Sequence, residues 1–243
     1  MPLYLCSMQK TCSIIVLLGA LLLSACGPSN EEKLSQSRQQ LQDGQYQQAI
    51  QTLNSFLEDN PEEATAYNMR GVAHLESSQP QDAISDFSQA IRYNSGDYRF
   101  WYNRANARRE VGDLPAALQD YNEAIRLKPD VADAYLNRAV VLFDMDNLAA
   151  ALQDIKLALE QAPLDALVQL NAGKIYYAQD SLEQASRHLL ESVRLDKQRG
   201  EAFYLLGNIA QRQNDLAQAC TLYKQAAQLG HQEGTVAAQS VCS

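Results

Sequence analysis

Positive charge is scarce in this chain. Twenty Lys and Arg face 29 Asp and Glu among 243 residues, which gives a net charge of −9. Proteins that bind nucleic acids or anionic membrane surfaces depend on basic side chains that meet phosphate groups. The composition therefore argues against both kinds of ligand, and we expect no nucleic-acid partner.

Glycine and proline are also sparse, with eleven and seven residues respectively. Both residue types interrupt regular helices, whereas the Ala, Leu and Gln that are abundant here favour helix formation. The balance of residue types therefore predicts helices rather than sheet.

Signatures of catalysis or metal binding are missing from the sequence. The three histidines, His74, His188 and His231, stand alone, and none lies at metal-ligand spacing from another His or Cys. We find no nucleophile elbow, no glycine-rich phosphate loop and no paired-carboxylate motif. We therefore predict no enzymatic activity, no metal and no cofactor, and we interpret the acidic side chains as a solvated outer face.

The N-terminal apolar run is too short to cross a membrane. Residues 14–23 give about ten apolar positions, whereas a spanning helix needs roughly 20 and a signal-peptide core about 7–15. The run ends in Leu23-Ser24-Ala25-Cys26, which resembles a bacterial lipobox. An ordinary secretory signal that happens to end in Cys, or an uncleaved anchor, would also fit this stretch.

The lipobox resemblance implies a membrane-anchored lipoprotein of the bacterial envelope. Residues 1–25 would be the cleaved signal peptide, and Cys26 would carry the lipid, including palmitate. Because Gly27 rather than Asp follows the cysteine, the resemblance also implies sorting to the outer membrane, facing the periplasm. Residues 26–33 would form the lipidated end and a short tether, whose seven extended residues span at most about 25 Å.

Two cysteines remain after the signal peptide and the lipidated residue are set aside. Cys6 and Cys12 leave with the signal, so Cys220 and Cys242 form an even pair in an oxidising compartment. We predict a disulfide between them. Two free thiols remain the alternative, and a metal site shared with His231 is disfavoured because the spacing matches no usual ligand pattern.

An internal repeat organises the rest of the chain. Alanine recurs every 34 residues without an insertion, at positions 49, 83, 117, 151, 185 and 219. If the repeats begin at residues 30, 64, 98, 132, 166 and 200, then repeat position 8 is always small: Ser37, Gly71, Ala105, Ala139, Gly173 and Gly207. Position 24 is always large: Leu53, Phe87, Tyr121, Ile155, Leu189 and Tyr223. Small and large residues in this register let two antiparallel helices approach closely.

Further features of the pattern mark the ends of the helices. Proline at position 32 of three repeats ends the second helix, and turn-forming residues stand near position 15: Gly44, Ser78, Gly112, Asp146, Asp180 and Asn214. The pattern resembles the tetratricopeptide repeat over residues 30–233, as repeats 30–63, 64–97, 98–131, 132–165, 166–199 and 200–233. The resemblance implies an all-α solenoid of six antiparallel helix pairs, a TPR superhelix, and we expect residues 234–243 to form a short capping helix.

Arginine at position 7 and aspartate at position 23 occur in the same repeats. Repeats two to four carry both residues, as Arg70 and Asp86, Arg104 and Asp120, Arg138 and Asp154, whereas the other repeats carry neither. A partly buried arginine is tolerated when it is paired, so we predict structural ion pairs between the two helices of each repeat. A ligand contact by Arg104 is the functional alternative, and Arg108 has no role that the pattern assigns.

The resemblance implies a concave groove lined by the first helix of each repeat. Its candidate binding residues are Arg99, Tyr102, Asn103, Asn106, Arg109, Asn137, Phe143, Asn171, Lys174, Tyr177, Tyr204 and Asn208. Asparagine at position 6 of three successive repeats can bond both polar groups of a peptide unit. The alternative is that these amides bond only to neighbouring groups of the chain. The lysine at position 5 that the carboxylate clamp of some family members requires is absent.

These features predict a non-catalytic scaffold or adaptor, anchored in the envelope by its lipid. It would hold a peptide segment or helix of a protein partner in the groove, in cell-wall enzyme docking or in secretion or pilus assembly. The alternative is a structural lipoprotein that associates with a second copy of itself, as a homo-oligomer. Sizing the unlipidated repeats at several concentrations separates these two hypotheses.

Overall fold

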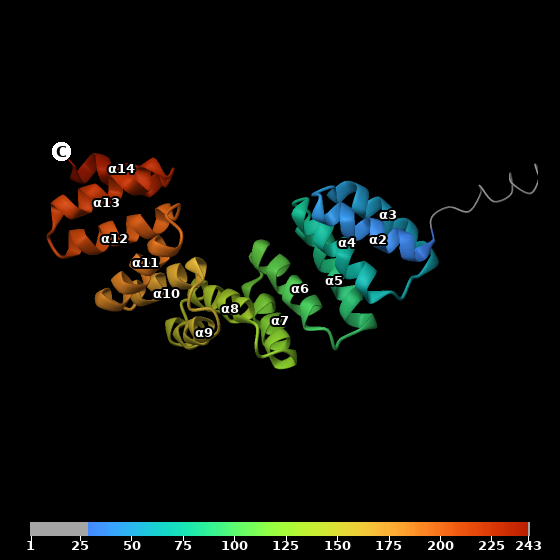
Figure 1. Ribbon diagram of the computed structural model, residues 1–243. Coiled ribbons are helices and arrows are strands. Elements are labelled where there is room, and N and C mark those ends of the chain that lie inside the picture. Colours follow the sequence, from blue (N-terminus) through green and yellow to red (C-terminus); the bar gives the residue numbers. More distant parts are fainter. Residues whose placement is uncertain (1–28, 243) are drawn as a thin grey trace, which may run out of the picture.

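A computed structural model describes residues 29–242, and these form thirteen helices with no strand among them (Figure 1). The first helices of the six pairs, here called A helices, are α2 (Asn30–Gln42), α4 (Ala64–Glu76), α6 (Tyr98–Glu110), α8 (Ala132–Asp144), α10 (Ala166–Ala178) and α12 (Gly200–Arg212). The second helices, the B helices, are α3 (Tyr46–Asp59), α5 (Pro80–Tyr93), α7 (Leu114–Leu127), α9 (Leu148–Gln161), α11 (Leu182–Leu195) and α13 (Leu216–Gln228). A last helix, α14 (Gln232–Val241), follows the sixth pair. The predicted fold class is confirmed.

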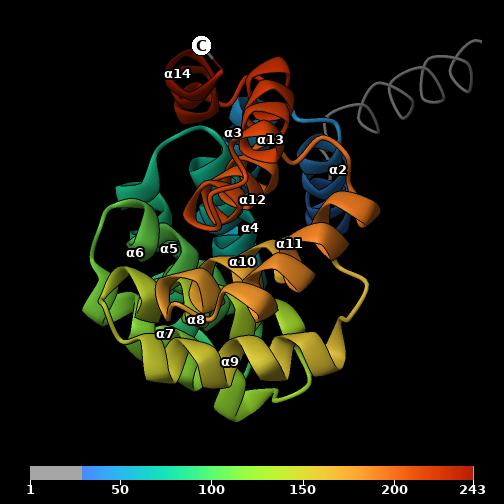
Figure 2. The ribbon, with the colours of Figure 1, turned by 90° about the vertical axis from the view of Figure 1, so that its left-hand side faces the viewer.

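The helix pairs stack in chain order into a curved array. α8 and α9 lie near the middle of the arc, and the two ends rise on the same side of it (Figure 1). Seen from the left-hand side of this view, the C-terminal pairs lie in front of the N-terminal ones (Figure 2). Each pair therefore contacts its neighbours along the chain, as expected for a solenoid.

The turn inside each pair depends on one residue in the left-handed region of backbone conformation. Position 15 has a positive φ in every repeat, between 58° at Ser78 and 80° at Gly112. Glycine adopts this conformation readily, and Asn and Asp tolerate it better than other residues do. The turn residues expected near position 15 thus stand where the backbone requires them.

Contact between positions 8 and 24 sets the distance between the two helices of a pair. A Cβ added to Gly207 would lie 2.5 Å from the ring of Tyr223, and one added to Gly71 would lie 2.6 Å from the ring of Phe87. Such distances are far below van der Waals contact, so the helices pack against each other with no space for a methyl group. The rings of Tyr223 and Phe87 are fully buried as a result.

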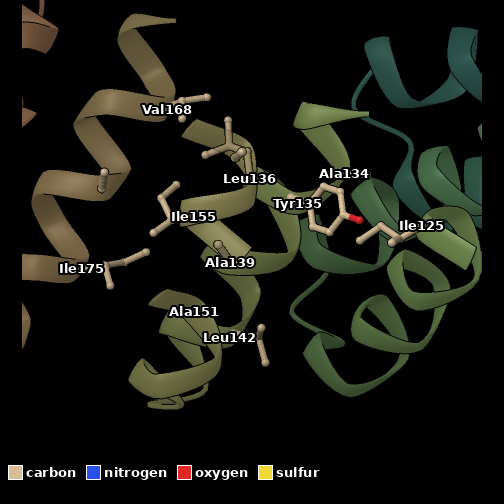
Figure 3. Close-up of a cluster of buried hydrophobic side chains, with 12 residues drawn as sticks. Ile125, Ala134, Tyr135, Leu136, Ala139, Leu142, Ala151, Ile155, Val168 and Ile175 are labelled. Carbon is tan, nitrogen blue, oxygen red and sulfur yellow. The ribbon is translucent and has the colours of Figure 1, made fainter. Parts of the chain in front are cut away.

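The core runs between repeats as well as within them. In the central cluster, Tyr135 points from α8 toward Ile125 of α7, while Ile155 of α9 lies near Ile175 of α10 (Figure 3). These side chains come from three successive repeats and are at least nine-tenths buried. A single repeat could not bury its apolar faces alone, so the core needs the whole stack.

Two expected segment boundaries need correction. Residues 30–33, expected in an extended tether, form the first turn of α2, because the Ser29 hydroxyl caps the helix and Glu32 bonds back to the Ser29 N–H. The capping helix begins at Gln232, two residues before its expected start, where His231 caps it. The signal peptide and Cys26 lie outside the described residues.

Candidate functional site

The arginines at position 7 reach from an A helix to the B helix of the same repeat. Nε and Nη2 of Arg70 donate to the two carboxylate oxygens of Asp86, at 2.8 and 2.6 Å. The other two pairs have the same geometry: Arg104 with Asp120, both bonds 2.8 Å, and Arg138 with Asp154, both bonds 2.7 Å. Such two-bond contacts are the strong form of ion pair, and hydrogen bonding to Asp86 raises the pKa of Arg70.

Each of these arginines also contacts the preceding repeat. Its Nη1 donates to the side chain at position 25 of that repeat: Arg70 to Asn54 at 2.7 Å, Arg104 to Ser88 at 3.0 Å and Arg138 to Asn122 at 2.8 Å. Each guanidinium also lies 5.1–5.7 Å from the aromatic ring at position 4, namely Tyr67, Trp101 or Tyr135. One arginine thus joins three helices of two repeats.

Arg108 belongs to the same interior. Its Nη1 donates to Asp120 Oδ2 at 2.8 Å and to the Ala116 carbonyl at 3.3 Å. The Asp120 side chain is only 2% exposed, and the Arg104 side chain 12% exposed. Asp120 therefore compensates two guanidinium groups, and neither Arg104 nor Arg108 is free to serve a ligand.

A linked set of polar side chains joins α6 and α8 beside a hollow that Asn106 and Asn137 help to line. Asn137 Nδ2 donates to Tyr102 Oη at 2.8 Å and to Asn106 Oδ1 at 3.3 Å. The Tyr121 hydroxyl, which comes from α7 behind them, donates to the same Asn106 oxygen at 2.5 Å. Burial raises the pKa of Tyr102 and of Tyr121, so both phenols stay protonated over the physiological range; Tyr121 donates its proton to Asn106, and the Tyr102 oxygen accepts from Asn137.

This network decides which amide atoms face the groove. Asn106 Oδ1 accepts two internal hydrogen bonds, whereas its Nδ2 has only the contact with Tyr102 that lowers the pKa of that phenol, which leaves one of its two N–H bonds without a partner in residues 29–242. Asn137 is the reverse, because its Nδ2 makes both contacts and its Oδ1 receives none among the described residues. The groove thus offers one donor and one acceptor, which are the two groups that a peptide unit needs. The amides bond to neighbouring groups and still keep capacity for a ligand.

The other two asparagines at position 6 differ from each other. Asn103 Nδ2 donates to Asn68 Oδ1 at 2.9 Å, which extends the polar surface to α4. Asn171 Nδ2 instead donates to the Leu167 carbonyl of its own helix at 2.9 Å. The expected row of three asparagines is therefore not continuous, and Asn68 is a groove residue that the sequence reasoning missed.

Position 9 carries asparagine only where position 24 carries tyrosine. Tyr223 Oη donates to Asn208 Oδ1 at 2.9 Å, as Tyr121 does to Asn106. The other four repeats have neither residue at these positions. This joint occurrence is the sequence signal that could have identified the buried hydroxyl behind each amide.

Of the three charged groove candidates, Arg99 and Lys174 form ion pairs within the solenoid. Arg99 bonds Asp97 at the start of α6 through Nε and Nη2, and this contact lowers the pKa of Asp97. Lys174 Nζ lies 2.7 Å from Glu201 Oε1 of the next repeat. Arg109 is half-buried and has no carboxylate within 4.0 Å in residues 29–242. It is the predicted groove residue whose charge remains open to a ligand.

The aromatic candidates on α8, α10 and α12 each have a partner within the chain. Phe143 is half-buried against the central core cluster. Tyr177 lies under the guanidinium of Arg212, 5.6 Å from the ring centre. Tyr204 stacks on His231 with ring centres 4.8 Å apart.

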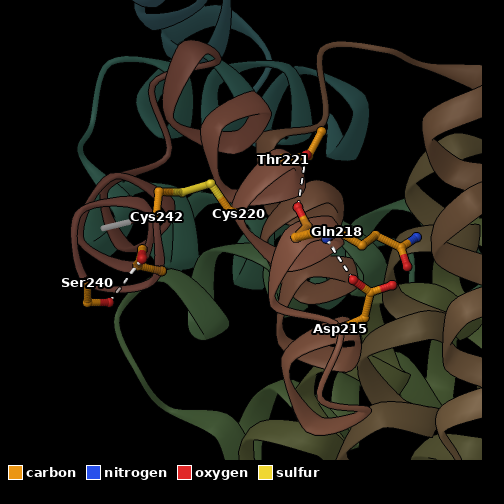
Figure 4. Close-up of a disulfide and its surroundings, with 8 residues drawn as sticks. Asp215, Gln218, Cys220, Thr221, Ser240 and Cys242 are labelled. Carbon is orange, nitrogen blue, oxygen red and sulfur yellow. Dashed lines mark hydrogen bonds between the residues drawn. A yellow bond between two sulfur atoms is a disulfide. The ribbon is translucent and has the colours of Figure 1, made fainter.

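A disulfide joins Cys220 of α13 to Cys242 at the end of α14 (Figure 4). The two Cα atoms lie 5.1 Å apart, and 22 residues separate them in the sequence. α14 packs mainly on α13 and covers the end of the stack. The crosslink thus closes the solenoid where no further repeat follows among the described residues.

Two negative findings concern residues 29–242. No group of three or more His, Cys, Asp or Glu is placed to hold a metal ion there. In the same part of the chain, no helix has the length and apolar character needed to cross a membrane.

Comparison with known proteins places the chain in a family. The tetratricopeptide repeat family model matches residues 34–97, 69–130, 102–166 and 170–233. No match was found among curated proteins. Proteins of this fold bind protein or peptide partners and are typically non-catalytic scaffolds.

Several solved structures share the fold at low sequence identity. Pseudomonas aeruginosa PilF is 21% identical, with a TM-score of 0.76 over 87% of this chain and 95% of that one. YrrB, described as a TPR protein with an unusual peptide-binding site, is 18% identical, with a TM-score of 0.63 over 77% of this chain and 96% of that one. MamA from Desulfovibrio magneticus RS-1 is 22% identical, with a TM-score of 0.63 over 69% of this chain and 94% of that one. Since the family model matches most of its length, the chain belongs to the tetratricopeptide repeat family.

Proposed function

We propose that this protein is a lipid-anchored adaptor of the bacterial envelope that holds a segment of a partner protein in its concave groove. The observation that carries the proposal is the oriented amide pair, in which Asn106 offers a donor and Asn137 an acceptor. A surface of this kind binds polypeptide backbone with little reading of side chains. The family's general role in protein–protein interaction supports the same function.

Lipid anchoring rests on the sequence around Cys26. The apolar run and the Leu-Ser-Ala-Cys stretch support a lipoprotein signal, and the disulfide between Cys220 and Cys242 suits an oxidising compartment. Because α2 begins at Asn30, the tether is three residues, 27–29, and spans at most about 11 Å. The anchored solenoid would therefore stay close to the outer membrane.

Photo-crosslinking in living cells tests the groove. A photoreactive residue in place of Asn137 should capture one partner protein on illumination, because this position faces the groove next to Asn106 and Tyr102. The matched control is the same residue at Glu58, which is exposed on the B helix α3. Capture from Glu58 with none from Asn137 would overturn the proposal.

Metabolic labelling tests the anchor. Cells fed radioactive palmitate should label the wild-type protein and leave the Cys26→Ser variant unlabelled, and the variant should leave the membrane fraction. Retention of the variant in the membrane without label would show that another segment anchors the protein.

A further inference from the structure

A cavity opens in the middle of the groove, where α4, α6 and α8 meet. Its volume is about 640 Å³, and its lining includes Asn106, Arg109 and Asn137. Three of the predicted binding residues therefore surround one hollow.

The rim of this cavity carries a row of carboxylates at the spacing of the repeat. Glu76, Glu110 and Asp144 each occupy position 13, the last residue of α4, α6 and α8. The other repeats have Gln42, Ala178 and Arg212 at this position. The carboxylates are thus confined to the three repeats that border the cavity.

These carboxylates have no partner within the solenoid. All three are exposed, and none forms an ion pair among residues 29–242. By contrast, the aspartates at position 23 of the same repeats are buried, and each forms an ion pair with an arginine. Arg109 lines the same hollow, so the lining carries three carboxylates and one guanidinium and its net charge is −2. This negative excess attracts a further cation.

We propose that this cavity selects a basic partner segment, one that carries Lys or Arg side chains along an extended backbone. The inference rests on the proposed groove function and adds the chemistry of the occupant. The basic side chains meet Glu76, Glu110 and Asp144 at the rim, while the backbone lies over the amides of Asn106 and Asn137. Arg109, which has no internal carboxylate, donates to a backbone carbonyl of the segment.

Binding of defined peptides to the full-length protein, purified in nonionic detergent, tests the selection. The probes are three fluorescent twelve-residue peptides of Gly and Ser with blocked termini, carrying four Lys, four Glu or no charged residue. Anisotropy should show the lysine peptide binding about tenfold more tightly than the neutral one at low salt, and much less so at high salt. Equal or tighter binding of the glutamate peptide would overturn the proposal.

Variants of the rim separate local contacts from net charge. The triple variant Glu76→Gln, Glu110→Gln, Asp144→Asn should bind the lysine peptide no more tightly than it binds the neutral peptide. The matched control Glu58→Gln, Asp82→Asn, Glu160→Gln removes three charges from exposed positions on B helices and should weaken lysine-peptide binding less than about twofold. Equal losses in both triple variants would mean that the net charge, not the cavity, selects the peptide.

The photo-crosslinking experiment distinguishes two outcomes: the basic preference is wrong, or the adaptor function itself is wrong. Capture of a partner from position 137, with the same yield in the rim variant, would remove the basic preference and keep the adaptor. Loss of capture in the rim variant, with normal capture in the control variant, supports both.

Discussion

Repeats 2–4 and repeats 5–6 build the same helix pairs with different chemistry at the same positions. In repeats 2–4, positions 7 and 23 hold arginine and aspartate, whereas repeat 6 has Leu206 and Leu222 there. Both versions place a small residue against a buried large one at positions 8 and 24. Close helix packing is therefore the common requirement. The ion pairs fill the adjoining space in repeats 2–4, Ala172 and His188 fill it in repeat 5, and two leucines fill it in repeat 6.

The difference has a consequence for how the repeats are joined. In the central repeats each arginine also bonds position 25 of the preceding repeat, so polar contacts link the stack. At the C-terminal end Leu190 occupies position 25 and is 56% exposed, and the disulfide of the cap closes the stack instead. We expect the two regions to respond differently to loss of an ion pair or of the disulfide.

Removal of a shared carboxylate should have the largest effect. Asp120→Ala leaves Arg104 and Arg108 without their partner in a nearly dry site, so the free energy of unfolding should fall by about 3–5 kcal/mol. Urea denaturation measures the change, with the exposed Asp130→Ala as control. Equal, small effects of both substitutions would show that the central pairs contribute nothing.

Loss of the disulfide should act on the C-terminal region alone. For a loop of this length the crosslink contributes about 3 kcal/mol in the chain-entropy model. Cys242→Ser should therefore lower hydrogen-exchange protection in α13 and α14 and leave α6 and α7 unchanged. Two titratable thiols in the untreated wild-type protein would show that the bond is not formed.

A methyl group at position 8 should damage both regions alike. Gly207→Ala and Gly71→Ala each press a Cβ into a buried ring at 2.5–2.6 Å, which should cost about 1–3 kcal/mol. Gly96→Ala, whose nearest contact would be 3.4 Å away, is the control in thermal unfolding. A large loss at Gly71 with none at Gly207 would mean that the regions do not share this packing.

The smallest effect concerns pH and belongs to repeat 5. His188 replaces the aspartate of position 23, stacks on Tyr176 and bonds Gln169. Burial lowers the pKa of His188 below its ordinary value of 6.5, so the unfolded chain binds the proton more readily than the folded one. Stability should therefore decline as the pH falls below about 6.5. In urea titrations the His188→Gln variant should lack this part of the decline, and an identical pH profile would contradict the assignment.

The sequence predicts the helix pairs well because the packing rule recurs six times without an insertion. The joint loss of arginine and aspartate likewise pointed to the contacts that Arg70 and Arg138 make. Arg108 shares position 11 with His74, which faces Asp86 at 3.7 Å, but the other repeats have no basic residue there, so two examples were too few to reveal the contact. The orientation of Asn106 depends on a hydroxyl from α7, and Asn171 turns to its own backbone. The orientation of each amide depends on the distances between helices, and the repeat pattern in the sequence gives no such distances.

A double-mutant cycle on Arg138 and Asp154 tests most directly the central claim that the position-7 arginines hold helices together. Arg138→Leu and Asp154→Leu should each lower the free energy of unfolding by about 3–5 kcal/mol, because each leaves the other charge without its partner. The double variant recreates the Leu206 and Leu222 pair of repeat 6 and should lie within about 1.5 kcal/mol of the wild type. Losses that simply add in the double variant would contradict the claim.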